Sequence, residues 1–155
     1  TQLYLKKATQ TFFTRHWSTS SCGGIESPDW SAPWALAGSI PSTDKQGCYA
    51  FLAGDSVKYI GSAVGKGAGI YKECGIGART ANYMRWAKER GPQNGQRNYE
   101  MKPQYREVTA LVTIGFPSGY GYLALALEAF LIAEFKNQGL QNIKSTTSLA
   151  GSEEE

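Results

Sequence analysis

The stretch GCYAFLAGDSVKYIG, residues 47 to 61, decides the fold of this chain. Two short runs of residues that favour strands, Gly47–Ala53 and Ser56–Ile60, flank the pair Gly54-Asp55. A Gly-Asp pair suits a tight reversal between neighbouring strands, so these residues predict a β-hairpin.

Three elements are expected after this hairpin. Residues 78–90, ARTANYMRWAKER, follow a helical pattern that stops at Gly91-Pro92, and a polar loop extends from there to residue 103. Residues 105–116 are rich in β-branched side chains and predict a third strand. The apolar segment after Gly119 predicts a helix that ends at Gly139. The order β-β-α-β-α predicts an α/β (α+β) fold with helices packed on a small sheet.

Residues 1–46 are expected to form an arm packed on the core. Trp30 and Trp34, in a segment rich in Gly, Pro and Ser, are expected to fold onto the body of the protein, and a contact with DNA or a second copy is the alternative. Residues 47–145 would form the main domain and residues 146–155 a tail. A partial helical period predicts an opening helix through Leu3, Leu5, Ala8 and Phe12.

The composition is that of an ordinary globular domain. Hydrophobic residues make up 41% and charged residues 19% of the 155 residues. No apolar run reaches the roughly 18 residues that a membrane span needs. Three cysteines without a CxxC pair and a single histidine argue against a disulfide framework and a zinc cluster. We therefore expect a cytoplasmic protein without a membrane segment.

Positive charge is concentrated in one segment. Between Arg85 and Arg106 there are six Lys or Arg residues and two Glu, whereas the whole chain has a net charge of +3. A local excess of positive charge favours a polyanion such as nucleic acid as a partner. A solvated loop that happens to be basic has the same composition and stays open.

The glycine-dense stretch after the hairpin does not fit a phosphate-binding loop. Around the pair Gly65-Lys66, a P-loop would need a glycine at position 60, where the chain has Ile60, and a Ser or Thr at position 67, where it has Gly67. The GxGxxG spacing fails as well, so no nucleotide cofactor is expected. The glycines fit better a mobile connection whose backbone can approach another closely.

Glu128 stands alone in an apolar helix. From Tyr122 to Ala133 every other side chain is apolar or aromatic. A helix that is hydrophobic all round is buried, and an ionised carboxylate there must be protonated, paired or bound to a metal. Taken by itself, the residue fits a core glutamate paired with Arg79 or a tyrosine as well as a metal ligand.

The tripeptides Gly47-Cys48-Tyr49 and Tyr59-Ile60-Gly61 place two tyrosines on adjacent strands, ten residues apart. Arg79, Glu128 and Asn142 follow in that order. This arrangement resembles the GIY-YIG nuclease family, and the resemblance extends from Gly47 to about Asn142. It implies a small central three-stranded antiparallel sheet flanked by helices. It also implies a DNA endonuclease that hydrolyses phosphodiester bonds with one Mg²⁺ or Mn²⁺ ion per active site.

The resemblance also implies roles for single residues. Tyr49 would be the general base or would orient the water, and Tyr59 would hydrogen-bond near the nucleophile or the scissile phosphate. Arg79 would hold that phosphate, and Tyr83 matches a tyrosine of some members. Glu128 would be the only protein ligand of the metal. The residues expected to have structural roles near the site are Gly47, Gly61 and Asn142.

Elementary chemistry supports these roles. The planar fork of arginine suits a phosphate, and Mg²⁺ keeps several waters, so one carboxylate is a sufficient protein ligand. The reference pKa of tyrosine is about 10, so Tyr49 could act as a base only beside a strong positive charge such as Arg79 or the metal. Arg79 and Tyr83, at i and i+4, are expected on one face of the predicted helix.

The sequence departs from the family pattern at three places. Cys48 replaces the isoleucine of the first tripeptide and should face away from the site as a small apolar residue. The 17 residues between Gly61 and Arg79 form a longer link than many members have. Ser62 stands where many members carry a lysine. The lysines that could substitute for it are Lys66 and Lys72.

The partner implied by the resemblance is double-stranded DNA. Phosphate contacts would give salt-dependent affinity, and the polar loop residues Asn94, Gln96, Arg97 and Asn98 are of the types that read base edges. The predicted DNA-binding residues are Lys66, Lys72, Arg85, Lys88, Arg90, Arg97, Lys102 and Arg106.

Three functions remain open at this point. The first is a standalone, sequence-specific, restriction-like endonuclease, for which a homodimer would explain double-strand cleavage. The second is a repair, recombination or mobile-element nuclease domain whose specificity comes from a partner or another domain. The third is a catalytically inactive DNA-binding module, which only Ser62 supports.

Overall fold

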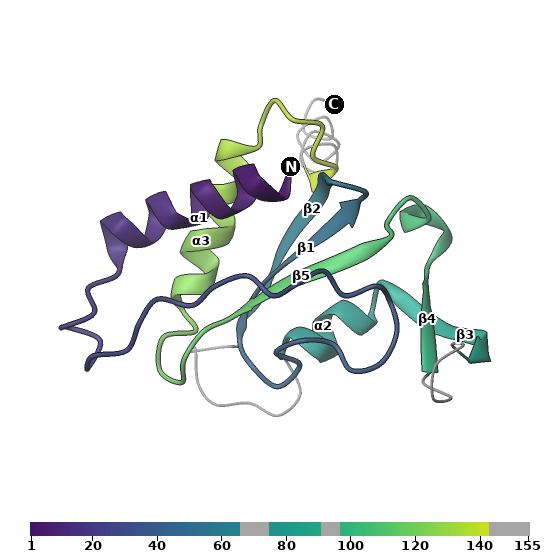
Figure 1. Ribbon diagram of the computed structural model, residues 1–155, viewed down its shortest axis with the longest axis horizontal. Helices are drawn as coiled ribbons and strands as arrows, with labels where there is room; N and C mark the ends of the chain where they lie inside the picture. Colours follow the sequence, from purple (N-terminus) through teal and green to yellow (C-terminus); the bar gives the residue numbers. More distant parts are fainter. Residues whose placement is uncertain (66–74, 91–96, 143–155) are drawn as a thin grey trace, which may run out of the picture.

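The computed structural model describes residues 1–65, 75–90 and 97–142, and these form an α+β fold (Figure 1). It has three α-helices, a three-stranded antiparallel sheet and a two-stranded sheet among the described residues. The three-stranded sheet has the order β2-β1-β5, so β1 is central and β2 and β5 are edges. Its strands are β1 (Gly47–Ala53), β2 (Ser56–Ala63) and β5 (Ala110–Gly115).

The predicted hairpin is confirmed. Strands β1 and β2 are antiparallel neighbours, with Tyr49 opposite Gly61 and a positive φ of 60° at Gly54 in the turn. Glycine adopts this backbone region without steric cost. The second strand continues three residues beyond the predicted end at Ile60, to Ala63.

Helices α1 (Gln2–His16) and α3 (Leu123–Glu134) cover one face of the three-stranded sheet (Figure 1). The opening helix is therefore confirmed. It begins where the Thr1 hydroxyl accepts a hydrogen bond from the Tyr4 amide, a typical N-cap. The buried cluster on this face joins residues of both helices and the sheet, among them Leu5, Phe12, Cys48, Ala50, Ile60, Val112, Ile114, Leu127 and Leu131.

The other face of the sheet packs on α2 (Ile76–Ala81) and on a two-stranded sheet of β3 (Met84–Arg90) and β4 (Arg97–Met101) (Figure 1). The segment after α1 connects the two sheets, because Trp34 forms a bridge with Leu111 in β5 and Ala37 forms one with Asn98 in β4. The tryptophans of this segment are folded onto the body as predicted, with exposed fractions of 5% at Trp30 and 7% at Trp34.

The helix predicted over residues 78–90 is wrong beyond Ala81. The chain turns at Asn82, continues as β3, and pairs with β4, which lies in the segment predicted as loop. Residues 84–90 are mostly good helix formers, but this intrinsic preference is weak and tertiary contacts override it. Here the contact is the stacking of Trp86 on Tyr99 across the strand pair.

The remaining boundaries also differ. Helix α3 ends at Glu134, five residues before the predicted cap, although Gly139 has a positive φ of 75°. Helix α3 is not buried all round, because Leu125 is about half exposed, as is Tyr122 directly before the helix. Strand β5 begins only at Ala110, and a short 3₁₀ turn precedes it. None of the helices within the described ranges combines the length and the apolar character that a membrane crossing requires.

Candidate active site

Three tyrosine hydroxyls converge on the hairpin. Tyr49 of β1 donates a hydrogen bond to the hydroxyl of Tyr83 over 3.2 Å, and the hydroxyl of Tyr59 of β2 lies 3.2 Å from the same oxygen. Tyr105 packs edge-on against Tyr83, with ring centroids 5.1 Å apart. The predicted site residues Tyr49, Tyr59 and Tyr83 therefore form one cluster, which we call the tyrosine cluster together with Tyr105.

The two motif glycines make this arrangement sterically feasible. A Cβ atom at Gly61 would overlap the phenol ring of Tyr49, which lies opposite it on the neighbouring strand. A Cβ atom at Gly47 would overlap the backbone carbonyl of Ile114 in β5. Gly61 therefore leaves room for the tyrosine, and Gly47 leaves room for the adjacent strand.

Asn142 fixes the edge strand β2 from outside. Its side-chain oxygen accepts a hydrogen bond from the Ile60 amide over 2.9 Å, and its amide nitrogen donates to the Ile60 carbonyl over 2.6 Å. Both backbone groups of an unpaired sheet edge are thus satisfied between the two motif residues Tyr59 and Gly61. This geometry fits the structural role expected of Asn142.

Tyr49 and Tyr59 keep their protons in the free protein, because the pKa of each is raised. Burial raises the pKa of Tyr49 well above its ordinary value, the hydrogen bond with Tyr83 adds to the rise, and the Arg79 guanidinium lowers it only in part. Burial also raises the pKa of Tyr59, and Tyr83, Tyr105 and the charge of Glu128 add to this. Neutral phenols suit the orientation of water or a phosphate oxygen better than the removal of a proton.

This raised pKa predicts how stability changes at high pH. The folded-state pKa of Tyr49 lies above the unfolded value of 10.0, so its contribution is fully present below about pH 10 and is lost as pH rises towards the folded pKa. In chemical denaturation, wild type should lose up to about 1.4 kcal/mol more per pH unit above pH 10 than Tyr49→Phe. Equal slopes for the two proteins would contradict a raised pKa, and the absorbance of tyrosinate gives an independent titration.

Arg79 lies in the last turn of α2 and is exposed. The expectation that it shares a helix face with Tyr83 is wrong, because α2 ends at Ala81 and Tyr83 follows in a turn whose amide donates to Thr80. The turn nevertheless keeps the guanidinium close enough to lower the pKa of Tyr49. Within the described ranges Arg79 makes no ion pair, so its charge is available to a substrate anion.

Glu128 reaches the same sheet edge from the opposite face. Its Oε2 accepts a hydrogen bond from the hydroxyl of Ser62 on β2, and its side chain is half-buried. The alternative of a core glutamate paired with Arg79 or a tyrosine therefore does not hold. Glu128 and the tyrosine cluster lie on the two sides of edge strand β2, and the carboxylate charge is still felt at Tyr59.

The donor set around Glu128 fits a magnesium site with a single protein carboxylate. No group of three or more His, Cys, Asp or Glu side chains gathers anywhere in residues 1–65, 75–90 and 97–142. Glu128 with the neighbouring Ser62 hydroxyl offers oxygen atoms, which Mg²⁺ prefers. Cys48 does not compete as a ligand, because it is fully buried on the α3 side and its thiol donates to the Ala124 carbonyl. It faces away from Tyr49, as predicted.

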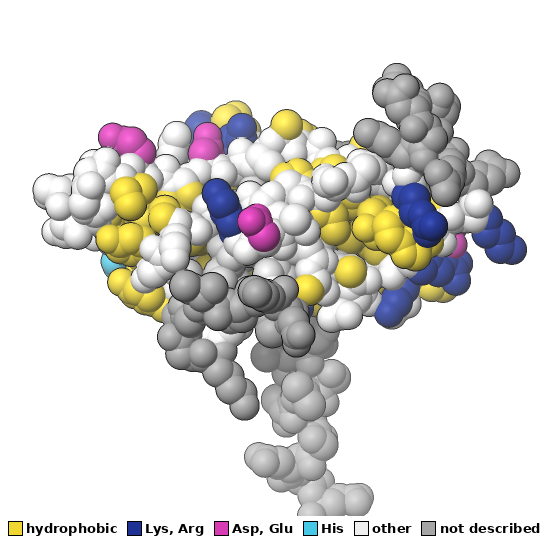
Figure 2. Space-filling view, turned by 90° about the horizontal axis from the view of Figure 1, so that it is seen from below, with side chains coloured by type: hydrophobic (Ala, Val, Ile, Leu, Met, Phe, Trp, Pro, Cys, Tyr) yellow, Lys and Arg dark blue, Asp and Glu magenta, His cyan; other side chains and the backbone are white. Residues whose placement is uncertain are grey.

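Basic residues surround the β3–β4 hairpin. Figure 2 shows Lys and Arg side chains gathered around hydrophobic ones at the end of the molecule where Figure 1 places this hairpin. Arg85 pairs with Glu100 over 2.5 Å, whereas Lys88, Arg97 and Arg106 are exposed and Lys102 is half-buried. Three predicted DNA-binding groups lie outside the described part of the structure: Lys66, Lys72 and the side chain of Arg90. The loop residues Asn94 and Gln96 also lie outside it.

The expected mobile connection also falls mainly outside the described residues, between positions 66 and 74. Its last two glycines are described, and they do approach another backbone closely. A Cβ atom at Gly75 or Gly77 would overlap Thr43. The amides of Ile76 and Gly77 donate to the carbonyls of Lys45 and Thr43, so these first amides of α2 are already bonded.

Sequence reasoning missed two members of the site. Ser62 was noted only as a departure from the family, yet it bonds the carboxylate of Glu128. Tyr105 was included only as the first residue of the predicted third strand, yet it packs on Tyr83 and Tyr59. Successive side chains of a strand point to opposite faces of the sheet, so the sequence could have shown that Ser62 faces away from the side of Gly61. No sequence signal connects Tyr105 with the hairpin.

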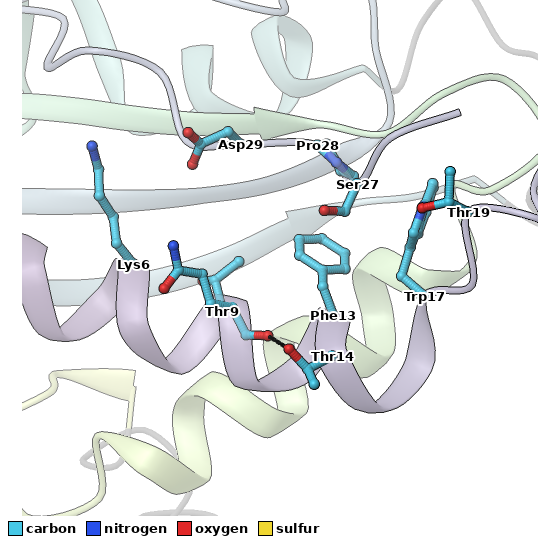
Figure 3. Close-up of a pocket in the computed structure, with 10 residues that line it drawn as sticks. Lys6, Thr9, Phe13, Thr14, Trp17, Thr19, Ser27, Pro28 and Asp29 are labelled. Atoms are coloured by element: carbon cyan, nitrogen blue, oxygen red, sulfur yellow. Dashed lines mark hydrogen bonds between the residues drawn. The ribbon is translucent and has the colours of Figure 1, made fainter. Parts of the chain in front are cut away.

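An open cavity of about 500 Å³ lies between α1 and the segment that follows it (Figure 3). It is lined by polar side chains such as Lys6, Thr14 and Asp29 around Phe13 and Trp17. None of the predicted site residues lines it. The cavity is therefore separate from the candidate active site.

Comparison with known proteins yields no relative: no protein-family model, no curated protein and no solved structure matches the chain. The functional interpretation therefore depends on the residues and on their geometry.

Proposed function

We propose that this chain is a divalent-metal-dependent DNA endonuclease of the GIY-YIG type. The observation that carries the proposal is the convergence of Tyr49, Tyr59 and Tyr83 at the hairpin, beside Arg79, which is exposed and makes no ion pair with any described residue. The carboxylate of Glu128 at the same edge strand supports it. Hydrolysis of a phosphodiester needs positive charge and hydrogen-bond donors where negative charge grows, and these residues supply both.

Each residue then has a defined task. The Arg79 fork binds the scissile phosphate and offsets the charge that develops on its oxygens. The neutral hydroxyls of Tyr49 and Tyr59, aligned through Tyr83, orient the attacking water and a phosphate oxygen. Glu128 holds the metal, and Ser62 fixes the orientation of its carboxylate. When bound, Mg²⁺ would supply Lewis-acid stabilisation and acidify water.

The endonuclease is proposed to be standalone and restriction-like, because the exposed cations of the β3–β4 hairpin would provide a DNA contact next to the site. A cytoplasmic location belongs to the same proposal. A homodimer that cuts both strands belongs to the same proposal. A nuclease domain guided by a partner is the alternative, and fragment patterns separate the two. Discrete fragments from long DNA indicate sequence recognition, whereas a smear or structure-dependent nicking indicates the alternative.

The test is cleavage of supercoiled plasmid and long linear DNA with Mg²⁺, with Mn²⁺ and with EDTA. We expect discrete products with either metal and none with EDTA, because EDTA removes the ion that would acidify the water and offset the negative charge of the phosphate. DNA binding without cleavage in both metals would contradict the enzyme proposal. It would leave an inactive DNA-binding module as the function.

A further inference from the structure

The β3–β4 hairpin exposes an aromatic stack that the fold does not need to bury. Trp86 is 51% exposed, and its ring stacks on Tyr99 with centroids 4.3 Å apart and planes 27° from parallel. The rings of Tyr99 and the buried Trp34 are in edge-to-face contact, with their centroids 5.4 Å apart. The guanidinium of Arg97 lies over the Trp86 ring, 4.9 Å from its centroid. Arg97, Trp86, Tyr99 and Trp34 thus form a continuous stack from solvent to core.

This stack holds Arg97 in place. Trp86 and Tyr99 are cross-strand partners, and the Tyr99 amide donates to the Leu36 carbonyl over 2.7 Å. The carbonyl of Arg97 itself accepts a hydrogen bond from Gly38 over 3.2 Å. The backbone from the carbonyl of Arg97 to the amide of Tyr99 is therefore tied to the arm. A guanidinium held over an aromatic ring keeps its N–H edge free for a ligand.

The charges around the stack distinguish its two described arginines. Arg85 is neutralised by Glu100, whereas Arg97 has no ion pair among the residues that the structure describes. Lys88 is exposed and Lys102 is half-buried on the same hairpin. The hairpin therefore combines one arginine in a fixed position, Arg97, with the lysines Lys88 and Lys102. The lysines suit the phosphates of DNA, and the arginine suits a base edge.

We propose that the β3–β4 hairpin enters the major groove of duplex DNA and that Arg97 reads a guanine there; this inference rests on the proposed endonuclease function. The major groove admits a two-stranded β-ribbon, and a bidentate arginine on guanine O6 and N7 is the commonest specific contact. Strand β3 starts directly after Tyr83, so Trp86 stands roughly 10 Å along the chain from the tyrosine cluster.

The experiment is selection from a random pool of DNA duplexes in EDTA, with wild type, Arg97→Lys and the matched control Arg15→Lys, an exposed arginine of α1 that also lies over an aromatic ring. Wild type should enrich sequences with one fixed G·C pair. Arg97→Lys keeps the charge but loses the fork, so its preference for that pair should fall about 5- to 150-fold while binding to random duplex stays within about twofold. Arg15→Lys should enrich the wild-type sequence.

Each other outcome overturns the inference. Enrichment of the same G·C pair by Arg97→Lys would make Arg97 a phosphate contact only. Wild-type binding without sequence preference, or tighter binding of single strands that Trp86→Leu abolishes, would replace groove reading by charge or by base stacking. Cleavage by wild type with Mg²⁺, measured in parallel, separates failure of this inference from failure of the endonuclease proposal. Circular dichroism shows whether each variant is folded.

Discussion

Replacing Glu128 with glutamine is expected to lower metal-dependent cleavage of DNA by at least about 10³-fold while leaving DNA binding intact. Glutamine has the same shape, and its side-chain oxygen can still accept the hydrogen bond from Ser62, so the packing of α3 on β2 is preserved. What is lost is the negative charge that we propose holds the ion. Metal ions stabilise such transition states by several kcal/mol, and each 1.4 kcal/mol is a factor of ten in rate.

Two companion variants make this result specific to the carboxylate. Glu26→Gln removes an exposed acid from the arm and should cut like wild type. Ser62→Ala leaves the Glu128 charge but removes its hydrogen-bond donor, so cleavage should fall by less than about tenfold. The measurements are initial rates of plasmid cleavage and Kd for a duplex in EDTA. Cleavage by Glu128→Gln at a near wild-type rate would make Glu128 a glutamate bonded to Ser62 without a catalytic task.

The parts of the fold that the sequence predicted are those in which local pattern and tertiary packing agree. The hairpin has a turn pair at its tip, Gly54-Asp55, and both of its strands contribute to buried clusters, so local and long-range preferences coincide. Residues 84–90 show the opposite case. Their helix formers favour a helix, and contacts with the distant strand β4, such as the stacking of Trp86 on Tyr99, stabilise the strand instead.

The candidate site shows the same division. The order of the two tyrosines, Arg79 and Glu128 along the chain could be recognised by resemblance. The shared hydrogen bonds to Tyr83 could not, because they depend on where the turn after α2 places that side chain. Nor could the sequence show that Glu128 approaches β2 from the face opposite to the tyrosines. The roles of all these residues remain predictions until cleavage is measured.

Replacing Arg79 with alanine is the second change with a large expected effect. Removing one preorganised donor from a charge-stabilising site lowers kcat by about 10²–10³-fold, and we expect a loss of this size in the cleavage rate. Binding of duplex DNA should weaken only a few-fold, because most phosphate contacts are expected on the β3–β4 hairpin. The melting temperature should not change, since Arg79 is exposed and makes no ion pair within the described ranges.

The lysine variant and an electrostatic readout distinguish this role from a general need for positive charge. Arg79→Lys keeps the charge but not the fork, so its rate should lie between wild type and Arg79→Ala. Because the guanidinium lowers the pKa of Tyr49, its loss should move the tyrosinate titration of that residue further upward. The exposed Lys7→Ala on α1 is the control and should be neutral. If Arg79→Ala lowers binding and cleavage equally, Arg79 is one DNA contact among others, because transition-state stabilisation requires a loss in rate that exceeds the loss in affinity.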